Sequence, residues 1–265
     1  MEDYRIKQHP ILSIPDRKKI PFYWCNRKLI AHEGETISSA LFANGIRVFG
    51  HHHKDKSPQG IFCANGQCSQ CMVLVDGSPV KACMEQVLAE SHVEPLDGYP
   101  VLPQEEKEPD LVNLPEVKTK VLIIGGGPAG LSAALELGKL GVDCILLDDK
   151  HQLGGKLVLQ THRFFGSTQA VFAGTRGIDI GTKLEKELRK FESVKTWLNS
   201  TALAVFSDQK VGVFKNNEEY ILIEPEVLLV ASGAREKFIT FKGNTLPGVY
   251  GAGAFQTLVN RDLVK

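Results

Sequence analysis

Short alternations of apolar and polar positions run through the first hundred residues of the chain. Residues 20–25 are mostly apolar or aromatic, and a second apolar stretch, 29–31, follows a polar break, which predicts a β-hairpin. Apolar residues then recur at helical spacing within 37–43, directly after the capping residue Thr36, which predicts a helix. Short strands with one helix indicate a small α+β domain over residues 1–100.

The pattern changes in the second half of the chain. Prolines interrupt a charged stretch within residues 101–118, so we expect a linker there. A continuous apolar run, 121–124, then meets a glycine-rich turn, and helical spacing follows over 129–140. Another apolar run, 142–147, comes next. Strand, turn, helix and strand in this order predict a parallel sheet of the α/β class over residues 119–265.

Charge and hydropathy exclude several classes of function. The 265 residues include 31 Lys and Arg and 31 Asp and Glu, so the chain has no net charge with which to attract nucleic acid or an anionic membrane. No apolar run approaches the ~18 residues of a membrane-spanning helix, and the first residues lack the apolar core of a signal peptide. We therefore expect a cytoplasmic protein without a transmembrane segment and without a nucleic-acid partner.

Cysteines provide the first candidate chemistry. Four of the six lie within 21 residues, in the spacing C-x4-C-x2-C-x11-C. Gly66 allows the first three to share one tightly bent loop, and the Asp-Gly pair at 76–77 predicts a hairpin that returns Cys83 to Cys71. This spacing is typical of plant-type [2Fe–2S] clusters. The predicted ligands are Cys63, Cys68, Cys71 and Cys83.

Two other interpretations of the cysteines stay open at this point. Structural zinc sites favour two C-x2-C pairs, and only one such pair is present. The other alternative is that the clustered cysteines are buried thiols that bind no metal. The two remaining cysteines, Cys25 and Cys144, both lie in apolar runs, so we expect both to be buried and unreactive.

A second motif follows the apolar run at 121–124. Gly125, Gly127 and Gly130 form G-x-G-x-x-G, and Asp148 lies 23 residues after the first glycine, at the end of the next apolar run. In this fingerprint the glycines make the turn, admit a pyrophosphate and permit close helix packing, while the acid binds a ribose. The motif predicts a dinucleotide site and does not distinguish FAD from NAD.

Residues 1–100 resemble the β-grasp [2Fe–2S] domain of hydrogen cyanide synthase-like and sarcosine or proline dehydrogenase-like proteins. Residues 43–48 (ANGIRV) and 60–71 carry the resemblance. It implies that the four clustered cysteines ligate a [2Fe–2S] cluster.

The second half resembles glutathione reductase-like flavoproteins, which implies FAD. Residues 153–157 (LGGKL) are similar to their second glycine turn, 227–234 (VLLVASGA) to their A-T-G strand end, and 201–202 to the segment that meets adenine. The implied FAD-binding residues are Gly125, Gly127, Pro128, Ala129, Gly130, Asp148, Gly155, Lys156, Ala202, Ala231, Ser232 and Gly233.

The expected architecture is thus an α+β, β-grasp ferredoxin-like domain followed by an α/β Rossmann-like FAD-binding domain. The second domain is expected to be incomplete, because those flavoproteins continue into an NAD(P)H domain that has no counterpart before Lys265. We expect either a fragment or a chain whose partner subunit supplies the rest.

The resemblance implies an FAD- and [2Fe–2S]-containing oxidoreductase that acts on a small amine or amino acid such as sarcosine, proline or glycine. Other subunits of a dehydrogenase or oxidase complex are the expected partners. The alternatives are a non-catalytic electron-transfer or assembly subunit, an NAD(P)H-dependent reductase component, and a zinc-stabilised NAD-binding protein. The sequence identifies no catalytic side chain.

Overall fold

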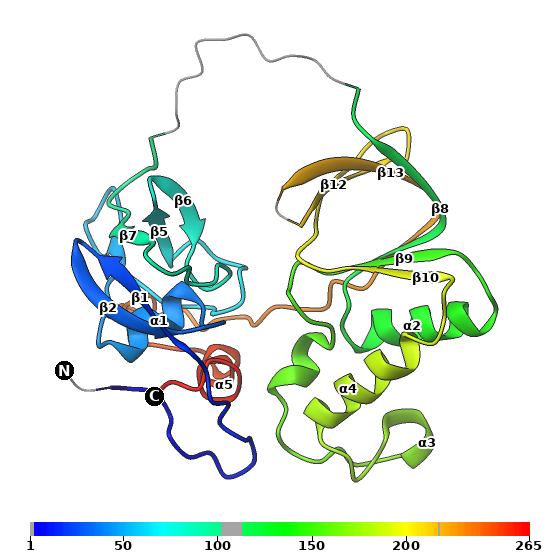
Figure 1. Cartoon of the computed structure of the whole chain (residues 1–265), viewed down its shortest axis with the longest axis horizontal. Coiled ribbons are helices and arrows are strands. Elements are labelled where there is room, and N and C mark those ends of the chain that lie inside the picture. The colour runs from blue at the N-terminus through cyan, green and yellow to red at the C-terminus, as the bar shows by residue number, and fades with distance from the viewer. Residues whose placement is uncertain (1–2, 102–112, 217) are drawn as a thin grey trace. The chain divides into compact units, whose positions relative to one another are not determined.

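The computed structural model describes residues 3–101, 113–216 and 218–265, which form two compact units (Figure 1). Unit 1 comprises residues 3–101 together with Arg235–Lys265, and unit 2 comprises residues 113–234. Among the described helices, none has both the length and the apolarity that a membrane span requires.

Unit 1 is built on a mixed five-stranded sheet in the order β2-β1-β7-β5-β6. The neighbours β1 and β7 are parallel, and the other neighbours are antiparallel. Strands β3 and β4 form a separate, short antiparallel sheet. The elements are β1 (Lys19–Trp24), β2 (Arg27–His32), α1 (Ile37–Ala43), β3 (Gly50–His51), β4 (Pro58–Gln59), β5 (Met72–Val75), β6 (Ser78–Lys81), β7 (His92–Pro95) and α5 (Ala252–Asn260).

Helix α1 begins where the sequence predicts. The Thr36 hydroxyl accepts a hydrogen bond from the backbone N–H of Ser39 at 3.2 Å and caps the helix. Every residue of α1 is buried. The helix packs into one core with Phe22 of β1 and with Phe49, which directly precedes β3. This mixed sheet with one packed helix confirms the expected β-grasp, ferredoxin-like fold.

The hairpin between β1 and β2 corrects one expectation. Trp24 pairs with Arg27, so Cys25 and Asn26 form a two-residue turn, and both have positive φ, 48° and 64°. Cys25 is therefore exposed in a turn, and the prediction of a buried Cys25 is wrong. The apolar run extends one residue further than the strand, because the turn needs two residues that leave the sheet.

Unit 2 contains a six-stranded sheet in the order β10-β9-β8-β13-β12-β11. The first four strands are parallel, and the last three form an antiparallel meander. The elements are β8 (Glu116–Ile124), α2 (Pro128–Lys139), β9 (Cys144–Leu147), the 3-10 helix η1 (Gly155–Leu159), α3 (Thr168–Val171), α4 (Gly177–Leu188), β10 (Val194–Trp197), β11 (Thr201–Val205), β12 (Val211–Lys215) and β13 (Glu219–Val230).

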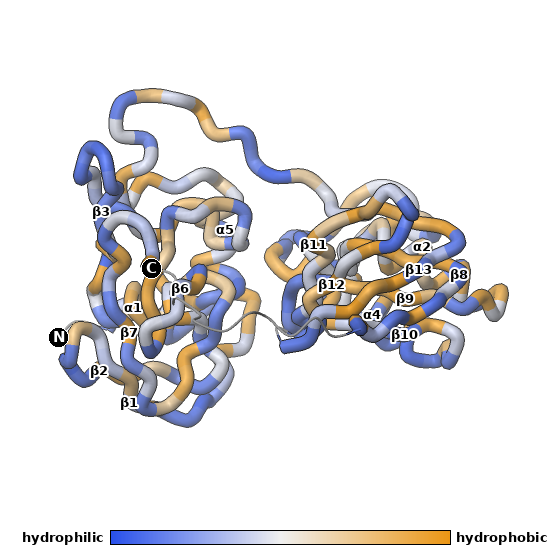
Figure 2. The backbone as a smooth tube through the Cα atoms, turned by 90° about the horizontal axis from the view of Figure 1, so that it is seen from above, coloured by the Kyte–Doolittle hydropathy of each residue, from blue (hydrophilic) through white to orange (hydrophobic). Residues whose placement is uncertain are grey.

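The central strands of unit 2 are buried on both faces, which explains their continuous apolar runs. Ile123 and Leu146 belong to the core under α2 and α4. Leu122 and Ile145 belong to a second core on the opposite face, together with residues of β12 and β13. Figure 1 shows the two helices on one side and the curved β12–β13 pair on the other, and Figure 2 shows the strands as mostly hydrophobic. This confirms the expected Rossmann-like α/β fold.

The C-terminal segment Arg235–Lys265 belongs to unit 1, which differs from the expected second domain, 119–265. Ala254, Leu258 and Val264 are buried in the core of unit 1. The tail is also tied to the N-terminal segment, because the N–H of Lys265 donates to the carbonyl of Tyr4 at 3.0 Å. The sequence did not predict this, because an apolar helix face can pack against any apolar core and does not indicate which unit it joins.

Only part of the expected linker, 101–118, is described. Residues 102–112 lie outside the described residues, while 116–118 already form the start of strand β8. The strand extends past its apolar run because its first residues pair with β13, with Glu116 opposite Leu222.

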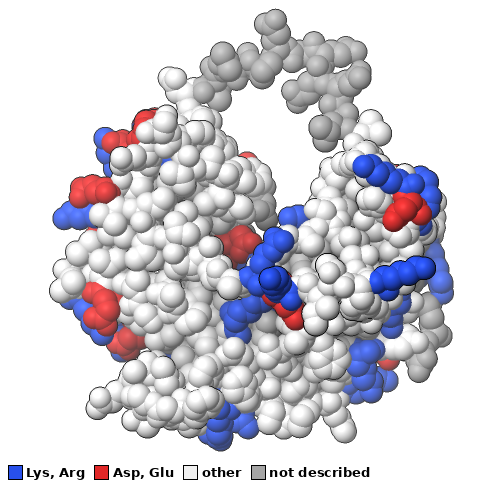
Figure 3. Space-filling model, turned by 180° about the vertical axis from the view of Figure 1, so that it is seen from behind, with Lys and Arg blue, Asp and Glu red and all other residues white. Residues whose placement is uncertain are grey.

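Charged residues of both signs are interspersed on the face shown in Figure 3. An ion pair between the partly buried Arg5 and the buried Glu35 tethers the N-terminal segment. Arg5 donates through Nε and Nη2 to both carboxylate oxygens of Glu35, at 2.7 and 2.8 Å. Burial opposes the charge on Arg5, but the bidentate bonds to Glu35 outweigh it and raise the pKa of the guanidinium.

Candidate cofactor sites

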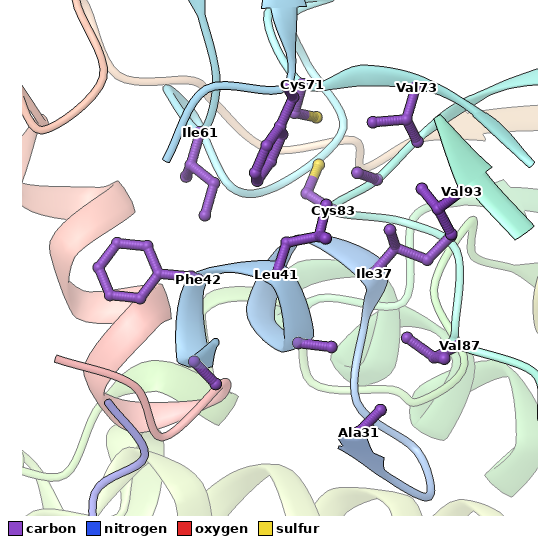
Figure 4. Close-up of a cluster of buried hydrophobic side chains, with 14 of the residues drawn as sticks. Ala31, Ile37, Leu41, Phe42, Ile61, Cys71, Val73, Cys83, Val87 and Val93 are labelled. Atoms are coloured by element: carbon purple, nitrogen blue, oxygen red, sulfur yellow. The ribbon is translucent and has the colours of Figure 1, made fainter. Parts of the chain in front are cut away.

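The four clustered cysteines come together in unit 1. Cys71 directly precedes β5 and Cys83 follows β6, and the N–H of Ala82 donates to the carbonyl of Cys71 at 3.0 Å. The hairpin thus returns Cys83 to Cys71, as its turn residues predict. Both are only 1% exposed. Figure 4 shows them among apolar side chains, with Leu41 and Ile61 nearby.

The four thiols form a hydrogen-bonded series, and these bonds shift their pKa values in opposite directions. Bonds from Cys68 and Cys83 lower the pKa of Cys63, and a bond from Cys83 lowers that of Cys71. The same bonds raise the pKa values of Cys68 and Cys83. Because thiolates are the metal-binding form of cysteine, metal binding at this site must release the thiol protons. Within the described residues, no three His, Cys, Asp or Glu side chains converge as a site for a single metal ion.

Backbone and charge around the thiols fit an anionic cluster. The N–H of Gly66 donates to the sulfur of Cys83 at 3.3 Å. Arg261, just after α5, forms an ion pair with Asp262, with Nε and Oδ1 2.6 Å apart. Burial opposes the charge on Arg261, but Asp262 and the nearby thiols of Cys83 and Cys63 raise its pKa. Four soft sulfur donors, an N–H donor and a partly buried cation suit an iron–sulfur centre. The sequence pattern carried no signal for Arg261, which lies far along the chain.

The glycine-rich turn at the end of β8 depends on two close backbone approaches. Gly125 has a φ of 110°, and a Cβ there would overlap the carbonyl oxygen of Ala231 at the end of β13. A Cβ on Gly130 would overlap the carbonyl oxygen of Gly125. The structure thus brings the fingerprint and the 231–233 segment together, and it explains the first and third glycines sterically.

Asp148 lies directly after β9 and is bound to the same turn. Its Oδ2 accepts a hydrogen bond from the N–H of Gly126 at 2.7 Å, and its Oδ1 accepts one from the N–H of Lys150 at 2.9 Å. Burial raises the pKa of Asp148, and these two backbone bonds partly offset that rise. The carboxylate is 8% exposed.

The N-terminus of α2 fits a bound phosphate group. Gly127 is the N-cap, without a side-chain cap bond, and Pro128 occupies the first helical turn. Ala129 follows it, and both Pro128 and Ala129 are exposed. Uncapped N–H groups at a helix N-terminus attract anions through hydrogen bonding and the helix dipole.

The second glycine turn packs against the first. The N–H of Gly154 donates to the carbonyl of Gly126 at 2.8 Å, and a Cβ on Gly155 would lie 2.8 Å from the Cα of Gly127. Lys156 is exposed in η1, beside this contact in the chain. The sequence motif at 153–157 had no local feature that predicts this packing.

The remaining predicted residues lie at the same end of the sheet of unit 2. Ser232 and Gly233 follow β13 and are exposed. Ala202 lies in β11, two residues after Ser200, whose N–H donates to the carbonyl of Asp148 at 2.9 Å. The predicted FAD residues therefore gather around the ends of β8, β9 and β13, where parallel α/β sheets bind ligands.

Cys25 and Cys144 lie outside the cysteine loop, and their different burial predicts a difference in thiol reactivity. Burial raises the pKa of Cys144 to about 11, whereas Cys25 is exposed. We expect a thiol reagent at about pH 8 to label Cys25 and to spare Cys144 in the folded holoprotein, because the thiolate is the nucleophile. Peptide mass spectrometry measures the labelling of each, and equal labelling of both would contradict the burial of Cys144.

The same pKa shift sets a pH dependence of stability. Because folding raises the pKa of Cys144 from 9.0 to about 11, folding favours its neutral form. This contribution is fully present below the unfolded-state pKa and is lost as the pH rises through about 11. The variant Cys144→Ala is expected to lose less stability over this alkaline window than the wild type, measured by denaturant unfolding at several pH values.

Comparison with known proteins places both sites in described families. Residues 17–96 match the 2Fe-2S iron-sulfur cluster binding domain. Residues 119–261, more than half of the chain, match the pyridine nucleotide-disulphide oxidoreductase family.

Each similar protein described here matches a larger share of this chain than of its own length. Sarcosine oxidase subunit alpha of Corynebacterium sp. (strain P-1) is 27% identical over 97% of this chain and 28% of its own length. Hydrogen cyanide synthase subunit HcnB of Pseudomonas protegens is 31% identical over 54% of this chain and 30% of its own. The L-proline dehydrogenase structure from P. horikoshii matches all of this chain and 50% of that chain, with a TM-score of 0.78 and 26% identity.

These matches confirm the resemblances inferred from the cysteine and glycine motifs, and with them the two cofactors, FAD and a [2Fe–2S] cluster. The chain spans about half or less of each relative described above. The chain belongs to the pyridine nucleotide-disulphide oxidoreductase family and carries a 2Fe-2S iron-sulfur cluster binding domain ahead of the family's region.

Proposed function

We propose that the chain passes electrons between FAD and its [2Fe–2S] cluster during the oxidation of an amine or amino acid such as sarcosine, proline or glycine. The observation that carries this proposal is the match of the whole chain, with both candidate sites, to half of an L-proline dehydrogenase. The relation to sarcosine oxidase subunit alpha supports the same substrate class. Two relatives are named as subunits, which supports action within a multi-subunit dehydrogenase or oxidase.

In this proposal the cysteine loop of unit 1 holds the cluster through Cys63, Cys68, Cys71 and Cys83. The burial of Cys63, Cys71 and Cys83 keeps water from three of the four sulfurs. The Gly66 N–H stabilises negative charge on the sulfur of Cys83. The chain thereby sets the potential of the cluster, while electron transfer itself is the chemistry of the cofactor.

In unit 2 each element would contact a different part of FAD. The N-terminus of α2, from Gly127, would bind the pyrophosphate, and Asp148 would accept hydrogen bonds from the adenosine ribose. By the same resemblance, Ala202 would lie against adenine, while Gly155, Lys156 and the 231–233 segment would lie along the remainder of the dinucleotide. When bound, the flavin accepts two electrons and the cluster carries one at a time.

The proposal is tested with the full chain isolated anaerobically together with the proteins that co-purify with it. Sarcosine, L-proline, glycine and, separately, NADH and NADPH are added, and flavin absorbance and the cluster's electron paramagnetic resonance signal are followed. We expect one of the three amines to bleach the flavin and then to reduce the cluster.

Other outcomes of this experiment would replace the proposal. Reduction by NADH or NADPH and by none of the amines would make the chain a reductase component. Reduction of both cofactors by dithionite alone would make it an electron-transfer or assembly subunit.

A further inference from the structure

We propose that Lys81 is a positioning residue for the [2Fe–2S] cluster, which anchors the cysteine loop so that the Gly66 N–H stays on the sulfur of Cys83. This inference rests on the proposed role of Cys83 as a cluster ligand. Neither the cysteine motif nor its spacing includes Lys81.

Two hydrogen bonds to one residue of the loop carry the inference. The Nζ of Lys81 donates to the carbonyl oxygen of Gly66 at 2.8 Å. The N–H of the same Gly66 donates to the sulfur of Cys83 at 3.3 Å. The loop is therefore held through both of the backbone polar groups of Gly66, and both partners lie at the end of one hairpin.

Strand pairing in the β5–β6 hairpin holds the backbone of Lys81 in place. Lys81 is the last residue of β6 and is paired with Met72 in β5, next to Cys71. Cys83 follows two residues later, so the anchor and the ligand share a short, sheet-bound segment. A shift of the loop relative to Lys81 is thus also a shift of the Gly66 N–H relative to the Cys83 sulfur.

Packing confines the same glycine from a third direction. Gly66 has a φ of 81°, and a Cβ there would lie 2.7 Å from the sulfur of Met84. The loop therefore rests against the flexible end of Met84, and its positive φ favours glycine at this position. The Lys81 bond holds the loop in this position, because it ties the Gly66 carbonyl to the hairpin.

The expected consequence is electrostatic. A hydrogen bond to a cluster sulfur stabilises negative charge and so favours the reduced, more negative form of the cluster. Loss of the Lys81 bond frees the loop, weakens the N–H bond to sulfur and removes a nearby cation. All three effects disfavour reduction and loosen the hold of the loop on the cluster.

The test compares Lys81→Met, which removes the donor, with Lys81→Arg, which keeps one. Lys28→Met is the control, because Lys28 is exposed on β2 of the same unit. Anaerobically purified holoproteins are assayed for iron and sulfide, for reduction potential and for the rate of cluster loss to an iron chelator. We expect K81M to lower the reduction equilibrium constant at least tenfold, which is about 59 mV for one electron, and to lose its cluster faster. K81R and K28M should stay close to the wild type.

A second variant reaches the same loop from the other side. Gly66→Ala places a Cβ against Met84 and strains the loop at a φ of 81°, and it is expected to shift the potential in the same direction as K81M. A wild-type potential and loss rate in K81M, with cluster present, would overturn the role of Lys81 alone. Absence of iron and sulfide from the wild-type holoprotein would overturn the ligand assignment and this inference together.

Discussion

Replacing Cys83 by serine is expected to remove the [2Fe–2S] cluster and to leave FAD bound. The side chain is 1% exposed in the core of unit 1 and interacts with Cys63 and Cys71. A serine hydroxyl is a poor substitute for a thiolate, which is the ligand that iron–sulfur clusters use. It also places a polar group among apolar neighbours, at a cost of about 1–3 kcal/mol when it is not satisfied.

The measurement is the number of iron, sulfide and flavin molecules per chain after anaerobic purification. Cys25→Ser is the matched control, because Cys25 is an exposed cysteine of the same unit and should keep its full iron content. Full iron in the Cys83→Ser variant would show that another residue completes the site. Stoichiometric zinc in place of iron in the wild type would contradict the cluster itself.

A pair of glycine variants should separate folding from FAD binding in unit 2. Gly130→Ala is expected to destabilise the unit and, as a result, to abolish FAD binding. Its Cβ would overlap the carbonyl oxygen of Gly125, which is backbone and cannot rotate away. Forcing atoms into a packed site costs about 1–3 kcal/mol or more. Because the cysteine loop belongs to unit 1, the cluster should remain.

Gly127→Ala is the matched partner of that variant. Here a Cβ would lie 3.9 Å from the nearest atom, the Cα of Gly155, and the φ of −74° suits alanine. The stability of the FAD-free chain should therefore change by about 1 kcal/mol or less, the size of an N-cap effect. FAD affinity should nevertheless fall steeply, because the new methyl group occupies the space through which the pyrophosphate approaches.

Calorimetric unfolding of the FAD-free chain and fluorescence titration with FAD provide the two readouts. Gly130→Ala should lower both the unfolding temperature and the affinity, and Gly127→Ala should lower the affinity alone. Wild-type FAD affinity in Gly127→Ala would show that the pyrophosphate does not lie at the N-terminus of α2.

The sequence alone predicted several features that depend on near neighbours along the chain, although it did not predict the turn at Cys25 and Asn26. The helix after Thr36, the hairpin at 76–77 and the return of Cys83 to Cys71 all follow from turn residues and spacing. The same holds for the strand–turn–helix order around 125–130, which placed Asp148 beside the turn. Such features are determined locally, because backbone sterics and hydrogen bonding act over a few residues.

Tertiary structure decided the features that join distant segments. Packing placed α5 in the core of unit 1, brought Arg261 close to Cys83, and folded β12 and β13 over the second face of the sheet in unit 2. It also decided that Lys81 reaches Gly66. An apolar face or a long cationic side chain fits many partners equally well, and only the assembled fold selects one of them.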